Sequence, residues 1–426
     1  MSALPSVRER VLHAASSVAE EALAFAAELV RIPTVNPPGE AYPDAAQAIG
    51  HRLERHGFAV RVLPAEGRAE HTARHPRTNV LGVLEGVAPG PTLPLTGPFD
   101  VVPAGDGWSV DPFAGLVRDG RLYGRGACDM KAGIAAAAYA AEALRRAGVR
   151  LRGRLEVSGT VDEESGGFAG VAWLCEQGLI ARGRTDYVVI PEPFGADRIC
   201  VGHRGVWWFD LVTHGRTAHG SMPYLGASAI DHMTALLEAV RLELQPALAG
   251  RETRMPVVPE GSRRATLNVN AIEGGQAGAS VQTPCVADRC SATLDRRFLL
   301  EEGIEAARGE VAELLERVRA RVPELTVELR DRMLVLPVET PAGSPLVASL
   351  ARAVREACGR EASLVASPGS YDHKHVARIA GVEHCVAYGP GRLELAHQPD
   401  EYVELADLEA SIQVLALCAL DLCGEG

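Results

Sequence analysis

Apolar residues recur at helical spacing over residues 8–30, and the run ends at Pro33 and the turn-rich stretch 36–39. This pattern predicts a helix followed by a loop. A second helical pattern covers 44–56, and strand-like runs follow at 59–63, 78–84 and 92–95. The last of these strands delivers Asp100 to its C-terminal end. The alternation predicts an α/β sheet with the functional site at the strand ends.

In the middle of the chain, between about residues 202 and 331, the pattern changes to a strand, a helix, two strands, a helix and a strand. The predicted elements lie at 206–213, 228–244, 264–272, 286–297, 301–322 and 326–329. The order βαββαβ predicts a ferredoxin-like α+β sandwich. Because α/β character returns from about residue 337, we expect a discontinuous catalytic domain (1–202 and 332–426) with an inserted domain (203–331).

Composition narrows the class of protein. At 426 residues, with 47% hydrophobic and 23% charged residues, the chain is long enough for two soluble domains. A net charge of -12 argues against nucleic acid and membrane surfaces as partners, while a small anionic substrate can still meet a local basic pocket. Residues 1–17 lack a secretory signal pattern, and the apolar run 133–144 is too short to span a bilayer. Nine cysteines without CxxC spacing indicate reduced thiols and a cytoplasmic location.

An acidic run, Asp162-Glu163-Glu164, stands between a strand-like segment and a Gly-rich turn. Adjacent acids can divide the work of a metal-dependent hydrolase, because one carboxylate binds a cation while its neighbour takes a proton from the attacking water. Two neighbouring glutamates alone are more often a solvated surface. Here further acids and a histidine stand beside small or turn-forming residues, in the order Asp100, Asp129, Glu192 and His397. This set favours a metal site.

Six ordered segments surround these residues: 95–103, 123–133, Glu163-Glu164, 191–193, 217–221 and 389–398. Through them the chain resembles the M20 family of metal-dependent peptidases and amidohydrolases, which includes acetylornithine deacetylase and succinyl-diaminopimelate desuccinylase. The resemblance covers nearly the whole chain. It implies a metallopeptidase-like catalytic domain and an inserted domain that mediates dimerisation, so a homodimer or higher homo-oligomer is expected.

The resemblance also assigns metal ligands. Asp129 takes the bridging position between two metals, Glu164 and His397 complete one site, and Glu192 belongs to the other. The chain departs from the family at Pro98, where the family word Gly-His-x-Asp has a histidine ligand. Proline offers a metal no lone pair, so the second site keeps too few protein ligands. We therefore expect one divalent transition metal ion (Mn, Zn or Co) per subunit.

Further roles follow for catalysis and substrate binding. Glu163 is expected to be the general base, because its neighbour serves as a ligand. The resemblance gives His219, reached from the opposite subunit, the role of stabilising the developing negative charge, and gives Arg297 the grip on a substrate carboxylate. Asn268 is a weaker candidate for a polar substrate contact. Relatives also have a cis peptide after the bridging aspartate, which is Asp129 here.

Three residues near this site have open roles. Asp100 orients the lost histidine in relatives. Here it binds substrate, reaches the metal through water, or is a structural acid held by backbone amides. Either His373 or His375 could replace the missing imidazole if their loop folded over the site, an interpretation that family geometry disfavours.

The sequence therefore predicts a metal-dependent hydrolase of a carbon–nitrogen bond in a small carboxylate-bearing substrate. The altered metal site favours an aromatic amine aminohydrolase of the 5-nitroanthranilate type, which releases ammonia by metal-hydroxide attack. An N-acyl amino acid deacylase or dipeptidase of the M20 type is the alternative within the same class. A catalytically dead binding module is the alternative from another class, and the retained Asp129, Glu163, Glu164 and His397 argue against it.

Overall fold

The computed structural model describes residues 5–276 and 284–425. The chain divides into two compact units. The first comprises Met1–Val201, Thr340–Val365 and Tyr371–Gly426, and the second comprises Gly202–Glu339 and Ala366–Ser370. The dimerisation role that we expect for the second unit stays a prediction.

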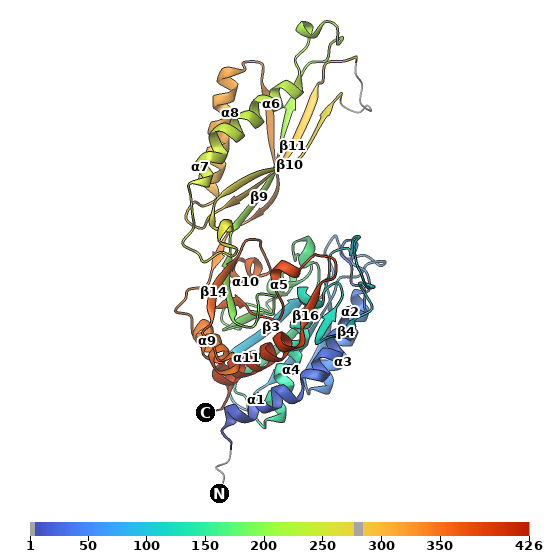
Figure 1. The fold of residues 1–426 in the computed structure, drawn as a ribbon, viewed down its shortest axis with the longest axis vertical. Coiled ribbons are helices and arrows are strands. Elements are labelled where there is room, and N and C mark those ends of the chain that lie inside the picture. The colour runs from blue at the N-terminus through green and yellow to red at the C-terminus, as the bar shows by residue number, and fades with distance from the viewer. Residues whose placement is uncertain (1–4, 277–283, 426) are drawn as a thin grey trace. The chain divides into compact units, whose positions relative to one another are not determined.

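The first unit is built on a mixed nine-stranded sheet in the order β1-β2-β6-β3-β7-β15-β8-β13, with β14 paired to β8 (Figure 1). β3 runs parallel to both β6 and β7, so the C-terminal ends of these three strands meet at one edge. The strands are β1 (Ala59–Pro64), β2 (Thr78–Glu85), β3 (Thr92–Pro98), β6 (Arg154–Thr160), β7 (Val188–Ile190), β8 (Arg198–His203), β13 (Val338–Glu339), β14 (Ser363–Ser367) and β15 (Cys385–Ala387). A small separate sheet contains β4 (Leu116–Arg118), β5 (Arg121–Tyr123) and β16 (Tyr402–Glu404).

Helices surround this sheet. They are α1 (Val7–Ser17), α2 (Ala19–Val30), α3 (Tyr42–Arg55), α4 (Ala132–Arg146), α5 (Val171–Glu176), α9 (Pro345–Cys358), α10 (His373–Arg378) and α11 (Leu405–Cys423). The single helix predicted for 8–30 is two helices, interrupted at Val18. Ser17 Oγ donates to the Ala14 carbonyl (2.7 Å), a local bond that competes with continuation of the helix. Within the described residues, no helix has the length and apolar character needed to cross a bilayer.

The alanine-rich helix α4 is the centre of the first core. It is buried along most of its length and packs against α11, β3 and β6. Its first turn approaches the loop after β7 so closely that a Cβ on Gly133 would lie 2.0 Å from the Pro191 carbonyl oxygen. Small side chains are therefore required where α4 meets the sheet.

The second unit has the predicted ferredoxin-like order βαββαβ. Its elements are β9 (Gly205–His214), α6 (Ala229–Ala239), α7 (Gln245–Ala249), β10 (Thr266–Gly275), β11 (Arg289–Phe298), α8 (Ile304–Arg321) and β12 (Thr326–Val335). The strands form an antiparallel sheet in the order β10-β11-β9-β12. Trp207 is buried, whereas the next residue, Trp208, is 36% exposed, as the alternation of a strand requires.

Two glycine-to-alanine changes in helices should have opposite effects on stability. Gly133→Ala forces α4 away from Pro191, and we expect a loss of about 1–3 kcal/mol in the free energy of unfolding. Gly309, inside α8, has open space around its Cβ position. Gly309→Ala should therefore stabilise the protein by about 0.5–1 kcal/mol. Urea unfolding measures the free energy of unfolding of both variants. If both free energies change by the same amount in the same direction, the close approach of α4 to Pro191 does not restrict the side chain at position 133.

Candidate metal centre

Three of the four predicted ligands meet in the first unit. Asp129 lies in the turn η1 (Ala127–Lys131) before α4, Glu164 lies in the turn η2 (Glu163–Ser165) after β6, and His397 follows a short turn after β15. One ligand atom from each lies within 4.8 Å of the other two. His397 Nε2 is 3.0 Å from Glu164 Oε1 and 3.5 Å from Asp129 Oδ2. The strand ends thus form a converging set of two carboxylates and one imidazole.

The donor set fits a divalent transition metal ion. Burial raises the pKa of Glu164 to about 8, and the neighbouring charges of Asp129 and Glu163 act in the same direction. Hydrogen bonds with Asp129 and Glu164 raise the pKa of His397 to about 10, so a cation is favoured at this position. Carboxylate oxygen and imidazole nitrogen are suitable ligands for Mn, Zn or Co.

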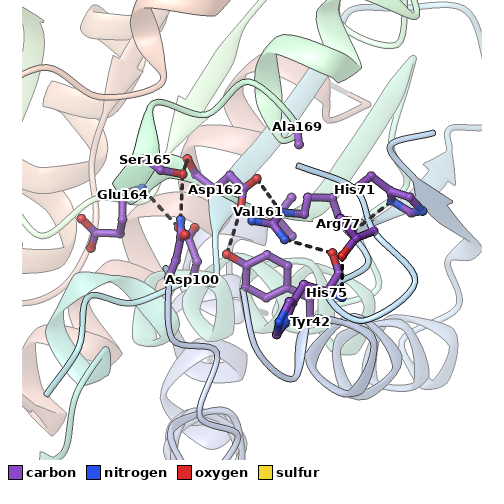
Figure 2. Close-up of polar contacts among 12 residues, drawn as sticks. Tyr42, His71, His75, Arg77, Asp100, Val161, Asp162, Glu164, Ser165 and Ala169 are labelled. Carbon is purple, nitrogen blue, oxygen red and sulfur yellow. Dashed lines mark hydrogen bonds and ion pairs between the residues drawn. The ribbon is translucent and has the colours of Figure 1, made fainter. Parts of the chain in front are cut away.

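The turn that carries Glu163 and Glu164 is held by a buried carboxylate. Asp100 Oδ1 accepts the backbone N–H of Glu163 (3.1 Å), and Asp100 Oδ2 accepts that of Glu164 (3.2 Å). Asn36 Nδ2 donates to Asp100 Oδ2 (2.8 Å) and to Ser165 Oγ (3.0 Å). Figure 2 shows Asp100 pointing at this turn. Of the three roles open for Asp100, these contacts match that of an acid held by backbone amides.

The residue before the glutamate pair is fixed independently. Asp162 has a left-handed backbone (φ 62°), which is uncommon for a residue other than glycine. Tyr42 Oη donates to Asp162 Oδ1 and Arg77 Nε to Asp162 Oδ2, each at 2.9 Å (Figure 2). The side chain is therefore fixed on both oxygens, and the turn begins in a defined direction.

The far end of the same turn contacts α10. His375 Nε2 lies 2.6 Å from the Gly166 carbonyl oxygen, so this nitrogen donates to the backbone. Gly167 has φ +76°, and a Cβ there would lie 2.3 Å from Asp372 Oδ1. Only glycine allows the turn to approach Asp372 and His375 this closely.

Asp129 is positioned in a similar way, by a residue that the sequence reasoning missed. Glu401 Oε1 accepts the backbone N–H of Cys128 (2.8 Å) and of Asp129 (3.0 Å). Glu401 Oε2 accepts from Arg125 (2.6 Å), and both of these side chains are buried. The peptide between Asp129 and Met130 is cis, as expected. The position of Glu401 four residues after His397 is the only signal for it in the sequence.

Glu163 and Glu192 lie outside the three-residue ligand group. Glu163 Oε1 faces Lys374 Nζ at 3.6 Å, and its side chain is only 16% exposed. Burial raises the pKa of Glu163, and the charge of Lys374 opposes that rise. Glu192, directly after β7, is buried, and this burial raises its pKa well above the usual range. The role of Glu163 as the base therefore stays a prediction, and no group of three metal-binding side chains that includes Glu192 is found within the described residues.

The two candidate replacement histidines are engaged elsewhere. His375 is bonded to Gly166, and His373 is buried near Thr340 Oγ1 (3.5 Å) and Tyr371 Oη (3.4 Å). Burial lowers the pKa of His373 to about 3. Neither belongs to the ligand group found among the described residues, and His375 is already bonded to the backbone.

The remaining predicted residues belong to the second unit. His219 is exposed, and its Nδ1 accepts the backbone N–H of Ser221 (3.1 Å), which leaves Nε2 as a donor. Arg297 forms a two-pronged pair with Asp295 (2.7 and 3.0 Å). Asn268 lies opposite Asp295 in the sheet and donates to Asn270 Oδ1 (2.5 Å). Their substrate-binding and charge-stabilising roles stay predictions.

A mixed α/β sheet with ligands at its strand ends, joined to an inserted ferredoxin-like unit, defines a metal-dependent hydrolase of the metallopeptidase type. The chain belongs to the peptidase family M20/M25/M40, whose model matches residues 95–421. A succinyl-diaminopimelate desuccinylase of Bordetella petrii is 32% identical over 395 residues, which cover 91% of this chain and 94% of the relative.

Solved structures share the fold at lower identity. The dipeptidase Dug1p of Saccharomyces cerevisiae superposes with a TM-score of 0.75 at 15% identity, covering 97% of this chain and 98% of that chain. The YXEP protein of Bacillus subtilis, described as a dinuclear metal binding peptidase of the M20 family, gives a TM-score of 0.66 at 16% identity, covering 96% and 99%. These likenesses support the architecture alone.

Replacing Asp100 should weaken metal binding without removing a ligand. In Asp100→Asn one acceptor oxygen becomes a donor that cannot bond to a backbone N–H, so the turn bearing Glu164 loses one of its two anchors. We expect a loss of about 10- to 100-fold in metal affinity, the usual effect of losing a group that orients a ligand. Calorimetric titration of the metal-free protein measures it. Asp106→Asn, an exposed acid, is the matched control, and equal affinities in the two variants would contradict the anchoring role.

Proposed function

We propose that this chain hydrolyses a carbon–nitrogen bond in a small substrate that carries a carboxylate. The observation that carries the proposal is the convergence of Asp129, Glu164 and His397 beside Glu163, which is anchored in the same turn as one ligand. A divalent ion held by these three residues would supply Lewis acidity at the bond that is broken.

Glu163 acts as the general base. Its carboxylate takes a proton from water as the water oxygen bonds to the substrate carbon, and it passes that proton to the nitrogen as the carbon–nitrogen bond breaks. His219, reached from the opposite subunit, stabilises with its Nε2–H the negative charge that develops on the substrate. Arg297 binds the substrate carboxylate in exchange for Asp295, its partner in the structure. Asn268 adds a polar substrate contact. Asp100 acts through the turn as a positioning residue.

Two substrate classes remain in contention. The relative named as a desuccinylase, aligned over most of both chains, favours an N-acyl amino acid, from which hydrolysis releases a carboxylic acid. Pro98 favours an aromatic amine of the 5-nitroanthranilate type, because a nitro group spreads the charge of the addition intermediate and demands less of the metal site. The preserved anchors of both ligand-bearing turns argue against a catalytically dead binding module.

The experiment that separates these classes is an assay of the purified protein on a panel of N-acyl amino acids, dipeptides and anthranilates. Release of a carboxylic acid or an amino acid supports the deacylase or dipeptidase. Release of ammonia from an anthranilate supports the aminohydrolase. Absence of turnover over the whole panel, with metal bound, would contradict the proposal of a C–N hydrolase for these substrates.

We further propose a cytoplasmic homodimer or higher homo-oligomer that assembles through the second unit. Nine cysteines, all free, support a reducing compartment. The net charge of -12 argues against nucleic acid and anionic membrane surfaces as partners. The proposed partner is a small anionic substrate.

Removal of the base should separate turnover from metal binding. We expect Glu163→Gln to lower kcat by about 10²- to 10⁴-fold, because the amide cannot accept the proton, while metal content stays that of the unaltered protein. Steady-state kinetics with elemental analysis measure both. Glu40→Gln, at an exposed position, is the matched control. Full activity of Glu163→Gln would place the base elsewhere.

The proposed stoichiometry is one divalent ion per chain, because Pro98 removes the imidazole of a second site. We expect chelation to remove this ion readily and to abolish turnover. His397→Ala should bring the metal content close to zero, whereas Glu192→Gln should leave it unchanged. Elemental analysis after gel filtration gives the content. Two ions per chain, or loss of one ion in Glu192→Gln, would refute the single-ion site.

A further inference from the structure

The printed sequence contains only two lysines, Lys131 and Lys374, although lysine and arginine together number 43. Both lysines are buried. All the remaining residues of these two types are arginines. Lys131 Nζ donates to the Ile32 carbonyl (2.7 Å). Lys374 has a different environment, because the nearest charged groups around it are two acids. The use of lysine at position 374, between two carboxylates, therefore calls for a specific explanation.

Lys374 lies between a predicted functional group and a buried acid. Its Nζ is 3.6 Å from Glu163 Oε1 and 3.9 Å from Asp372 Oδ1. The side chains of Lys374, Glu163 and Asp372 are 9%, 16% and 0% exposed. Both distances exceed that of a direct hydrogen bond, so the ammonium is shared between the two carboxylates.

Asp372 has no local explanation as a helix cap. It precedes α10, yet its side chain makes no capping hydrogen bond. Among the described residues, neither carboxylate oxygen has a hydrogen-bond partner, although both are buried. The close approach of Gly167 leaves no room for a larger side chain to supply one. A buried carboxylate without donors is costly unless a positive charge lies nearby, and the ion pair with Lys374 is the one that the structure offers within the described residues.

We propose that Lys374 is a built-in cation of the active site, which orients Glu163 from one side and neutralises Asp372 on the other. In the proposed site, Pro98 stands in place of a histidine ligand and one metal ion is bound. Lys374 supplies a second positive charge that a second metal ion would otherwise give. This inference rests on the proposed function in so far as Glu163 is the base. The role is that of a positioning residue, since Lys374 acts through Glu163.

The chemistry of lysine suits this role. Its ammonium is a compact charge on a flexible stem, whereas the planar guanidinium of arginine is best suited to a two-pronged partner in one plane. Glu163 and Asp372 approach from different elements, η2 and the start of α10, and therefore present two separate oxygens. Lys374 also has acids on two sides and little exposure, so its charge is committed within the protein rather than open to a substrate carboxylate.

The first experiment compares Lys374→Ala with Lys374→Arg in steady-state kinetics, with and without methylammonium. We expect Lys374→Ala to lose about 10- to 100-fold in kcat with little change in KM, as for other groups that orient a functional residue. Methylammonium should restore part of this loss with saturation, because it can occupy the vacated space. Tetramethylammonium, which cannot donate a hydrogen bond, is the control and should not. Lys374→Arg should retain more activity than Lys374→Ala.

Other kinetic outcomes would overturn the proposal. A rise in KM with unchanged kcat would make Lys374 a substrate anchor instead. A loss of kcat that no amine restores, in Lys374→Ala protein that is still folded at the assay temperature, would also reject the charge as the cause.

The second experiment needs no activity, so it is informative even if the proposed function fails. Thermal unfolding is measured on metal-free protein for Lys374→Met, Asp372→Asn and the double variant. We expect Lys374→Met to lower Tm, because it leaves Asp372 unpaired, and the double variant to regain much of the loss. Lys131→Met is the matched control, and adding Asp372→Asn to it should restore nothing. If the Tm changes of Lys374→Met and Asp372→Asn simply add, the two residues are uncoupled and the proposal fails.

Discussion

Two buried carboxylates, Asp100 and Glu401, determine the geometry of this active site. Each accepts two consecutive backbone N–H groups, Asp100 from the turn bearing Glu164 and Glu401 from the turn bearing Asp129. Turns at strand ends have unpaired amides, and a buried acid needs donors, so each group satisfies the other. The direction of the metal ligands follows from these bonds, because a ligand on an unanchored turn would sample many positions.

This arrangement places several acids in buried positions, and nearby arginines pair with two of them. Arg125 pairs with Glu401 and Arg77 pairs with Asp162, both in buried positions. The ligand group itself gathers two acids around one imidazole, which a divalent ion would balance. Lys374 Nζ lies 3.6 Å from Glu163, the proposed base, and adds a positive charge to this acidic region. We propose that the number of metal ions, the base Glu163 and Lys374 together set the charge balance of the site.

Periodicity and motif spacing predicted much of this protein. The βαββαβ order gave the ferredoxin-like unit, because helices and strands there alternate with clear apolar faces. The ligand roles of Asp129, Glu164 and His397 were implied by the family resemblance, and the structure brings these three side chains together. The break at Val18 was missed because both helices bury an apolar face in the same core. Glu401 was missed for another reason: it acts on backbone amides far away in the sequence, and such contacts leave no periodic signal.

We propose that Lys374, beside Glu163, replaces part of the positive charge that a second metal ion would give this site. A crystal structure of the metal-loaded protein, with diffraction recorded at the absorption edge of the bound metal, tests it most directly. The account predicts one anomalous peak within bonding distance of Asp129, Glu164 and His397, and Lys374 between Glu163 and Asp372. A second peak of equal height at Glu192, with Lys374 turned away from Glu163, would contradict it.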